Sequence, residues 1–411
     1  MLLAVIFPAF ARVALRFRWL APSVAMLLAL AANSLPAGAA PSIVVDVKTG
    51  KVISQTQATD RWYPASLTKL MTAYTVFKEI GKGRISLQSP VKVSSKALSE
   101  PPSKMGYPVG TVLTVETAIK ILMVKSANDI ATATAESTAG SEAAFVALMN
   151  ENAARLGMSN SHFINAHGLP DPDQYTSARD LAVLALAIRN EFPQYGKFFS
   201  IQAIKAGKRR LANHNPLLFR FDGTTGMKTG FTCSSGLNIV VSAKRGFREL
   251  IAVVLGGPTG QERNVRTAVL LSDGFKKNLF LVKQKVTDLK PSAFQRRDPV
   301  DMRETVCSRK KKSKAEAAKS SPATGSMFAL KTPSLDDLEA KYLKPQVAIT
   351  QIETVSLGHA TGPDPFNLLG EGNAAEVVAY TEETDAKWPM VFGTKNVKVP
   401  VPDPSPRRKS Q

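Results

Sequence analysis

A chain of 411 residues exceeds a typical single domain, so we expect a folded core with an extension. The formal net charge of +20 predicts an acidic neighbourhood, such as nucleic acid, an anionic membrane face or an anionic cell-wall polymer. The sequence has no interleaved basic and aromatic pattern and no zinc-ligand spacing, which argues against nucleic acid; we expect no metal and no cofactor.

The first 39 residues have the pattern of a secretory signal peptide. Arg12, Arg16 and Arg18 precede an apolar run at 19–32, and small residues around Ala39 suggest cleavage after that residue. An uncleaved membrane anchor is the alternative, although the run is short for a spanning helix. The sequence therefore predicts export to the periplasm or cell envelope.

A predicted hairpin and helix open the folded part, which we place at residues 40–285. Two β-rich runs flank a turn at 48–50, and Pro64 favours a helix start. Apolar residues then recur at three- and four-residue steps as far as a C-cap near Gly81. Ser66 would lie in the first turn with Lys69 one turn later on the same face, an arrangement in which a lysine can take the proton of a hydroxyl.

Further helices follow, and each has a capping signal. Thr114 opens one helix, Asp129 can cap the next, Ser141 begins another that stops at Gly157, and Ser177 with Asp180 forms a capping box before the last.

Strands close the predicted domain. They are expected at 226–232, 237–243 and 249–255, and a final helix at about 261–271. Terminal strands that bracket a block of helices indicate an α+β fold, with one antiparallel sheet, helices on both faces and a helical subdomain.

The composition changes beyond residue 285. We interpret 286–334 as a basic, low-complexity linker that contains the run Arg309–Lys314, and 335–411 as a mostly disordered tail with one short helix at 335–343. The basic run is either a solvated linker or an electrostatic contact to anionic membrane or wall.

Three short motifs share one chemistry. Ser66 and Lys69 supply a nucleophile and a general base. Ser126 can relay a proton to a leaving amine, and the Asn128 amide can hold a substrate amide.

The third motif lies on a predicted strand. Lys228 and Thr229 supply a cation and a hydroxyl for a carboxylate or acyl oxygen, and Gly230 permits close approach of substrate backbone. The backbone N–H groups of Ser66 and Phe231 are the expected oxyanion hole.

With these motifs in this order, the chain resembles the serine-type D-alanyl-D-alanine carboxypeptidases, the low-molecular-mass penicillin-binding proteins. The resemblance covers about residues 41–280 and extends to 145–157, 165–180 and Asp222-Gly223. It implies a β-lactamase/transpeptidase-like fold and removal of the terminal D-alanine from peptidoglycan stem pentapeptides, with β-lactams as covalent inhibitors.

The resemblance also implies roles for single residues. Ser66 would be acylated, Lys69 would be the base and Ser126 the relay, while Arg263 would contact the terminal carboxylate of the substrate. His167 is expected to hold a loop. Alternatives are a D,D-endopeptidase, a catalytically inactive wall-binding protein and a class A-like β-lactamase; the last is disfavoured because residues 158–176 contain no glutamate.

The sequence does not decide whether the two cysteines are paired. Cys233 and Cys307 would lie in an oxidising compartment, where they either form a disulfide or stay unrelated thiols. If the implied fold is right, Cys233 lies just past the active-site strand and Cys307 could reach it.

Overall fold

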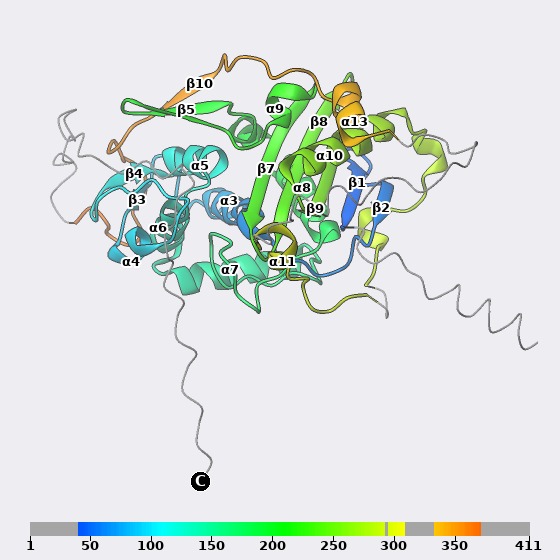
Figure 1. Ribbon diagram of the computed structural model, residues 1–411. Coiled ribbons are helices and arrows are strands. Elements are labelled where there is room, and N and C mark those ends of the chain that lie inside the picture. Colours follow the sequence, from blue (N-terminus) through cyan, green and yellow to red (C-terminus); the bar gives the residue numbers. More distant parts are fainter. Residues whose placement is uncertain (1–39, 292–294, 309–332, 371–411) are drawn as a thin grey trace, which may run out of the picture. The chain divides into compact units, whose positions relative to one another are not determined.

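The computed structural model describes residues 40–291, 295–308 and 333–370 (Figure 1). A five-stranded antiparallel sheet in the order β2-β1-β9-β8-β7 organises the fold. Its strands are β1 (Ser42–Asp46), β2 (Val52–Thr56), β7 (Thr224–Thr232), β8 (Gly236–Arg245) and β9 (Arg248–Gly257).

Helices cover both faces of this sheet. Along β9, side chains alternate between two apolar clusters: Ile251 and Val253 pack toward α8 (Ala178–Glu191), whereas Ala252 and Val254 pack toward α10 (Gly260–Lys276). The predicted α+β fold with helices on both faces is therefore confirmed.

The helical subdomain lies between β2 and α8 in the sequence. Thr114, Ser141 and Ser177 cap their helices as predicted, because each hydroxyl accepts a backbone N–H of the first turn. The elements before α8 are η1 (Ala65–Leu67), α3 (Thr68–Gly81), β3 (Pro90–Lys92), α4 (Ser95–Ser99), β4 (Val112–Thr114), α5 (Val115–Val124), α6 (Asn128–Ala139) and α7 (Glu142–Arg155).

Two predicted capping carboxylates have other roles. The cap of α6 is Ala127, and the Asp129 carboxylate accepts backbone N–H groups of Met105 and Gly106, which ties a loop to the helix. Asp180 does not complete a capping box; its carboxylate accepts from Asn160 N and Arg179 Nη1. A buried carboxylate needs hydrogen-bond partners, and backbone N–H groups of Met105, Gly106 and Asn160 supply them from other segments of the chain.

Short elements complete the described chain. The 3-10 helix η2 (Pro193–Phe199) leads into a small sheet of order β10-β5-β6, which the sequence did not predict. Its strands are β5 (Ala203–Ala206), β6 (Arg209–Ala212) and β10 (Ile352–Val355); the remaining elements are α9 (Leu217–Arg220), η3 (Leu279–Leu281), η4 (Val286–Asp288), α11 (Arg303–Val306) and α13 (Leu335–Tyr342).

The segment 333–370, here called the strap, packs against the rest of the domain. The predicted helix at 335–343 is confirmed as α13, which contacts α10, and β10 pairs in parallel with β5 (Figure 1). Farther along, Gly358 N donates to Val112 O and Lys92 Nζ donates to Leu368 O. The strap thus touches both the sheet side and the helical subdomain.

The signal peptide, the basic run at 309–314 and residues 371–411 lie outside the described residues, so the predicted domain boundaries stay predictions. Within the described ranges, no helix has the length and apolarity needed to cross a membrane.

Candidate active site

Ser66 lies in a tight turn between β2 and α3. Pro64 caps the 3-10 helix η1 that contains Ser66, and Ala65 has φ +48°, a left-handed conformation that non-glycine residues rarely adopt. Asn238 on β8 holds the turn, since its Nδ2 donates to the carbonyls of Tyr63 at 2.9 Å and Pro64 at 3.2 Å. The serine is therefore fixed by the sheet and not only by its own helix.

Lys69 is fully buried beside Ser66. Its Nζ lies 3.2 Å from Ser66 Oγ and donates to Asn128 Oδ1 at 2.7 Å and to the His167 carbonyl at 2.7 Å. Burial, followed by the charge of Lys228, lowers the pKa of Lys69 well below its usual value. A neutral amine keeps two N–H groups for the two carbonyl oxygens, which leaves its lone pair for the Ser66 hydroxyl.

Ser126 and Asn128 stand at the start of α6. Ser126 has φ +62° and lies just before the helix, so its hydroxyl is close to the strand side of the site. The Asn128 Nδ2 donates to Pro101 O at 2.9 Å while its Oδ1 accepts from Lys69, which fixes the orientation of the amide. One Nδ2 hydrogen remains for a substrate carbonyl.

Lys228 faces Ser126 from β7. Its Nζ donates to Ser126 Oγ at 3.0 Å and to Thr229 O at 3.0 Å, and the side chain is buried. Burial, together with the positive charge of Arg263, lowers the pKa of Lys228 to about 7. The two serines therefore each lie beside a buried lysine whose proton is loosely held.

Gly230 permits a close contact with the backbone of residues 64–67, whereas the sequence predicted a close contact with substrate backbone. A Cβ at this position would lie 3.0 Å from Pro64 O and 3.1 Å from both Ser66 N and Leu67 N. The backbone that approaches is the turn that contains Ser66, so Gly230 lets β7 lie against η1.

These residues surround one cavity of about 470 Å³. Seven of the nine site residues predicted from the sequence line it, and Lys69 and Lys228 lie buried behind Ser66 and Ser126. The seven are Ser66, Ser126, Asn128, Thr229, Gly230, Phe231 and Arg263.

Arg263 enters the cavity from the first turns of α10. Its Nε and Nη2 donate to Asn264 Oδ1 at 3.1 and 2.8 Å, and burial lowers its pKa to about 10. The cation keeps further N–H groups for an anionic ligand.

Sequence reasoning missed several residues that build this site. Asn238 gave a weak signal, a buried amide in an otherwise apolar strand, whereas the carbonyl role of His167 gave none. Other lining residues that were not assigned are Pro102, Ser103, Gly168, Leu169, His214, Thr232 and Leu237.

His167 does hold a loop, as predicted. Its Nδ1 accepts the N–H of Leu169 at 3.1 Å, and its Nε2 lies 3.4 Å from the Glu100 carboxylate. Among the described residues, no cluster of His, Cys, Asp or Glu is arranged to hold a metal ion.

The sequence of this chain is similar to that of a known protein family. A family model described as D-alanyl-D-alanine carboxypeptidase (peptidase S11) matches residues 29–259. The chain is 36% identical over 258 residues to the D-alanyl-D-alanine carboxypeptidase DacC of Escherichia coli K12, covering 61% of this chain and 63% of that protein. The chain spans less than two thirds of the length of this relative and of two further curated relatives, DacA of Haemophilus influenzae and DacF of Bacillus subtilis.

Solved structures show the same similarity. Penicillin binding protein 5 from Haemophilus influenzae is 34% identical with a TM-score of 0.55, covering 59% of this chain and 72% of that one. Penicillin-binding protein D2 from Listeria monocytogenes, in its cefotaxime-bound form, is 27% identical with a TM-score of 0.52, covering 57% and 96%.

Proposed function

The chain belongs to the D-alanyl-D-alanine carboxypeptidase family, and on that premise we propose that it is a serine-type hydrolase that removes the terminal D-alanine from peptidoglycan stem pentapeptides. The observation that carries the proposal is the distance of 3.2 Å between Ser66 Oγ and the buried Nζ of Lys69, beside an open cavity. Curated relatives that carry the carboxypeptidase name favour this activity over a cross-link endopeptidase.

In the proposed acylation step, Ser66 Oγ attacks the carbonyl carbon of the penultimate D-alanine while Lys69 Nζ takes the hydroxyl proton. The N–H groups of Ser66 and Phe231 donate to the oxyanion that forms. As the C–N bond breaks, Ser126 Oγ gives its proton to the leaving amine and receives one from Lys228 Nζ, 3.0 Å away.

In the proposed deacylation step, water is the nucleophile and Ser66 Oγ is the leaving group. Before this step Lys69 gives the proton that it took from Ser66 to water in the cavity, and Lys228 regains a proton from water. Lys69 then takes a proton from the attacking water, the resulting hydroxide adds to the ester carbonyl, and Lys69 returns that proton to Ser66 Oγ as the C–O bond breaks. Thr229 and Arg263 supply a hydroxyl and a cation for the terminal carboxylate of the substrate, since both line the same cavity. We further propose that β-lactams acylate Ser66, in keeping with the cefotaxime-bound relative.

Mass spectrometry tests the nucleophile. Incubation with benzylpenicillin should add the mass of one drug molecule to the wild-type chain and none to a Ser66→Ala variant. Release of D-alanine from a pentapeptide by the wild type alone would establish the reaction. Drug turnover without an adduct would indicate a β-lactamase, and neither adduct nor turnover in a folded sample would favour a wall-binding protein.

We propose in addition that residues 1–39 direct export to the periplasm or cell envelope and that residues 40–285 form the catalytic domain. The basic run at 309–314 would then lie in a linker that contacts anionic membrane or wall. Cell fractionation with N-terminal sequencing of the mature protein tests the export; a cytoplasmic protein that keeps Met1 would refute it.

A further inference from the structure

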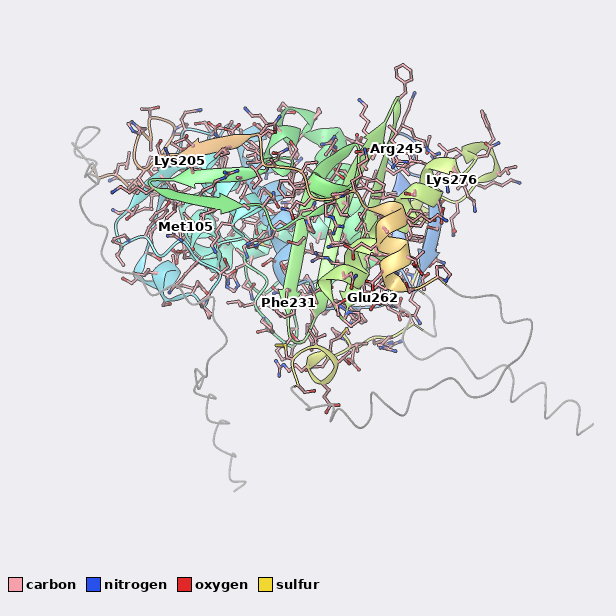
Figure 2. The ribbon with its side chains drawn as sticks, turned by 45° about the horizontal axis from the view of Figure 1, so that its top comes forward. Met105, Lys205, Phe231, Arg245, Glu262 and Lys276 are labelled. Carbon is pink, nitrogen blue, oxygen red and sulfur yellow. A yellow bond between two sulfur atoms is a disulfide. The ribbon has the colours of Figure 1, made fainter. Side chains whose placement is uncertain are left out.

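One end of the main sheet gathers three separate turns. The β8–β9 turn meets the end of α10, because Arg248 Nη1 donates to the carbonyls of Phe275 and Lys277 at 3.0 Å each. The turn between β1 and β2 joins them through Lys51, whose Nζ donates to Leu279 O at 2.9 Å. Figure 2 shows Arg245 and Lys276 at this end and Phe231 and Glu262 at the other.

Large apolar side chains project from these turns into solvent. Phe247 in the β8–β9 turn is 106% exposed, and Phe280 and Leu281 in η3 are 93% and 79% exposed. They are the most exposed large hydrophobic residues in the described part of the chain. Three such side chains at one end of a domain mark an interaction surface, since apolar groups in water are unfavourable.

Cations surround these apolar residues. The nearby carboxylates are partly neutralised, because Asp273 pairs with Lys276 at 3.4 Å and Glu249 pairs with Arg189 at 2.6 Å. The surrounding exposed cations are Lys48, Lys244, Arg245, Lys276, Lys277 and Lys283. We call this set, with Phe247, Phe280 and Leu281, the distal surface.

We propose that the distal surface docks on an anionic lipid bilayer, with Phe247, Phe280 and Leu281 entering the interfacial region and the cations contacting lipid phosphates. An anionic wall polymer would satisfy the cations but leave both phenyl rings in water. A bilayer satisfies both, because its surface is negative and its acyl boundary accepts apolar side chains. None of the residues of the distal surface belongs to the basic run at 309–314.

Docking in this way would orient the cavity. Strand β8 runs from Leu237, which pairs with Phe231 at the cavity, to Arg245 at the distal surface. That length is roughly 25 Å at the usual rise of a strand. The cavity would therefore lie away from the bilayer, on the side of the wall.

Vesicle co-sedimentation of the full chain tests the proposal. We expect binding to vesicles that contain phosphatidylglycerol, little binding to pure phosphatidylcholine, and weaker binding at high salt. A triple variant, Phe247→Ser with Phe280→Ser and Leu281→Ser, should lose at least tenfold in affinity, about one decade per 1.4 kcal/mol. Val109→Ser is the matched control, because Val109 is 52% exposed but lies in the helical subdomain.

Charge variants test the electrostatic part of the proposed membrane binding separately from the apolar part. Lys276→Gln with Lys277→Gln should weaken binding on the order of fivefold per cation. Lys205→Gln, an exposed lysine on β5 far from Lys276 (Figure 2), should leave it unchanged.

The outcome does not depend on catalysis, and penicillin acylation serves only to show that each variant is folded. Unchanged sedimentation of the triple variant would overturn the proposal and assign membrane binding to another segment, such as the basic run. Self-association that the triple variant abolishes would overturn it in favour of a second copy. As a second measurement, bromolipids should quench the fluorescence of a Phe280→Trp variant more than that of Val109→Trp.

Discussion

Three buried basic side chains lie at one small cavity, and the positive charge of one lowers the pKa of the next. Arg263 lowers the pKa of Lys228, and Lys228 lowers the pKa of Lys69, in both cases after burial as the larger cause. The repulsion between the Lys228 and Arg263 cations is unfavourable in a buried site, so the cavity favours an anionic ligand. The carboxylates of a stem peptide and of a β-lactam would each relieve this repulsion.

This coupling predicts how the pH profile of acylation responds to Lys228→Gln. In the proposed mechanism acylation needs neutral Lys69, so the acylation rate should rise as pH passes the pKa of that residue. Removal of the Lys228 cation takes away a cause that lowers this pKa, so the pKa of Lys69 rises and the acidic limb moves to higher pH. The glutamine keeps a donor for Ser126 Oγ.

The measurement is the second-order acylation rate with a fluorescent penicillin across the pH range. Lys125→Gln removes a cation that is not among the main causes of the lowered pKa of Lys69, so the acidic limb of this variant should stay in place. An acidic limb that stays unmoved in Lys228→Gln would show that the two lysines are not coupled.

At the scale of elements, the strap supports the rim of the cavity through one residue. Gln202 O accepts the N–H of Asn213 at 2.8 Å, and Asn213 directly precedes His214, which lines the cavity. The Gln202 Oε1 accepts N–H groups of Thr350 at 3.0 Å and Gln351 at 3.2 Å, just before β10. One side chain thus links the strap to the β5–β6 hairpin and through it to the site.

We therefore predict that Gln202→Ala loosens the β5–β6 hairpin. Loss of two hydrogen bonds should weaken the β10–β5 pairing by roughly 1–3 kcal/mol and raise the trypsin cleavage rate at Lys208–Arg210 on the order of tenfold. Limited proteolysis with mass mapping measures this. Gln202→Glu, which keeps the acceptor oxygen, should restore protection; equal cleavage in all three proteins would show that the strap does not order the hairpin.

At the scale of the whole molecule, the sequence predicted the features that depend on residues close together in the chain. The main strands, the capped helices and the order of the site motifs follow from periodicity, hydroxyl caps and the family resemblance. The pairing of β10 with β5 was not predictable, because residues about 150 apart meet in a short strand without period-2 alternation. Asn238 was missed for the same reason: its partners Tyr63 and Pro64 lie in another element.

The pairing of Cys233 with Cys307, left open by the sequence, is present and joins residues 74 apart. The bond fixes segment 295–308 beside the end of β7, where Met302 N also donates to Ser234 O at 3.0 Å. A cross-link of this span limits the unfolded chain, so its loss should cost roughly 2–4 kcal/mol and lower the melting temperature by about 5–15 °C.

Calorimetry of a Cys233→Ser, Cys307→Ser double variant measures this loss. Reductant supplies the matched control, because it should lower the melting temperature of the wild type toward that of the variant and leave the variant itself unchanged. Acylation by penicillin at 25 °C should persist in the variant, since neither sulfur lines the cavity. Non-reducing peptide mapping that finds both thiols free in protein purified without reductant would contradict the cross-link and, with it, the predicted gain in stability.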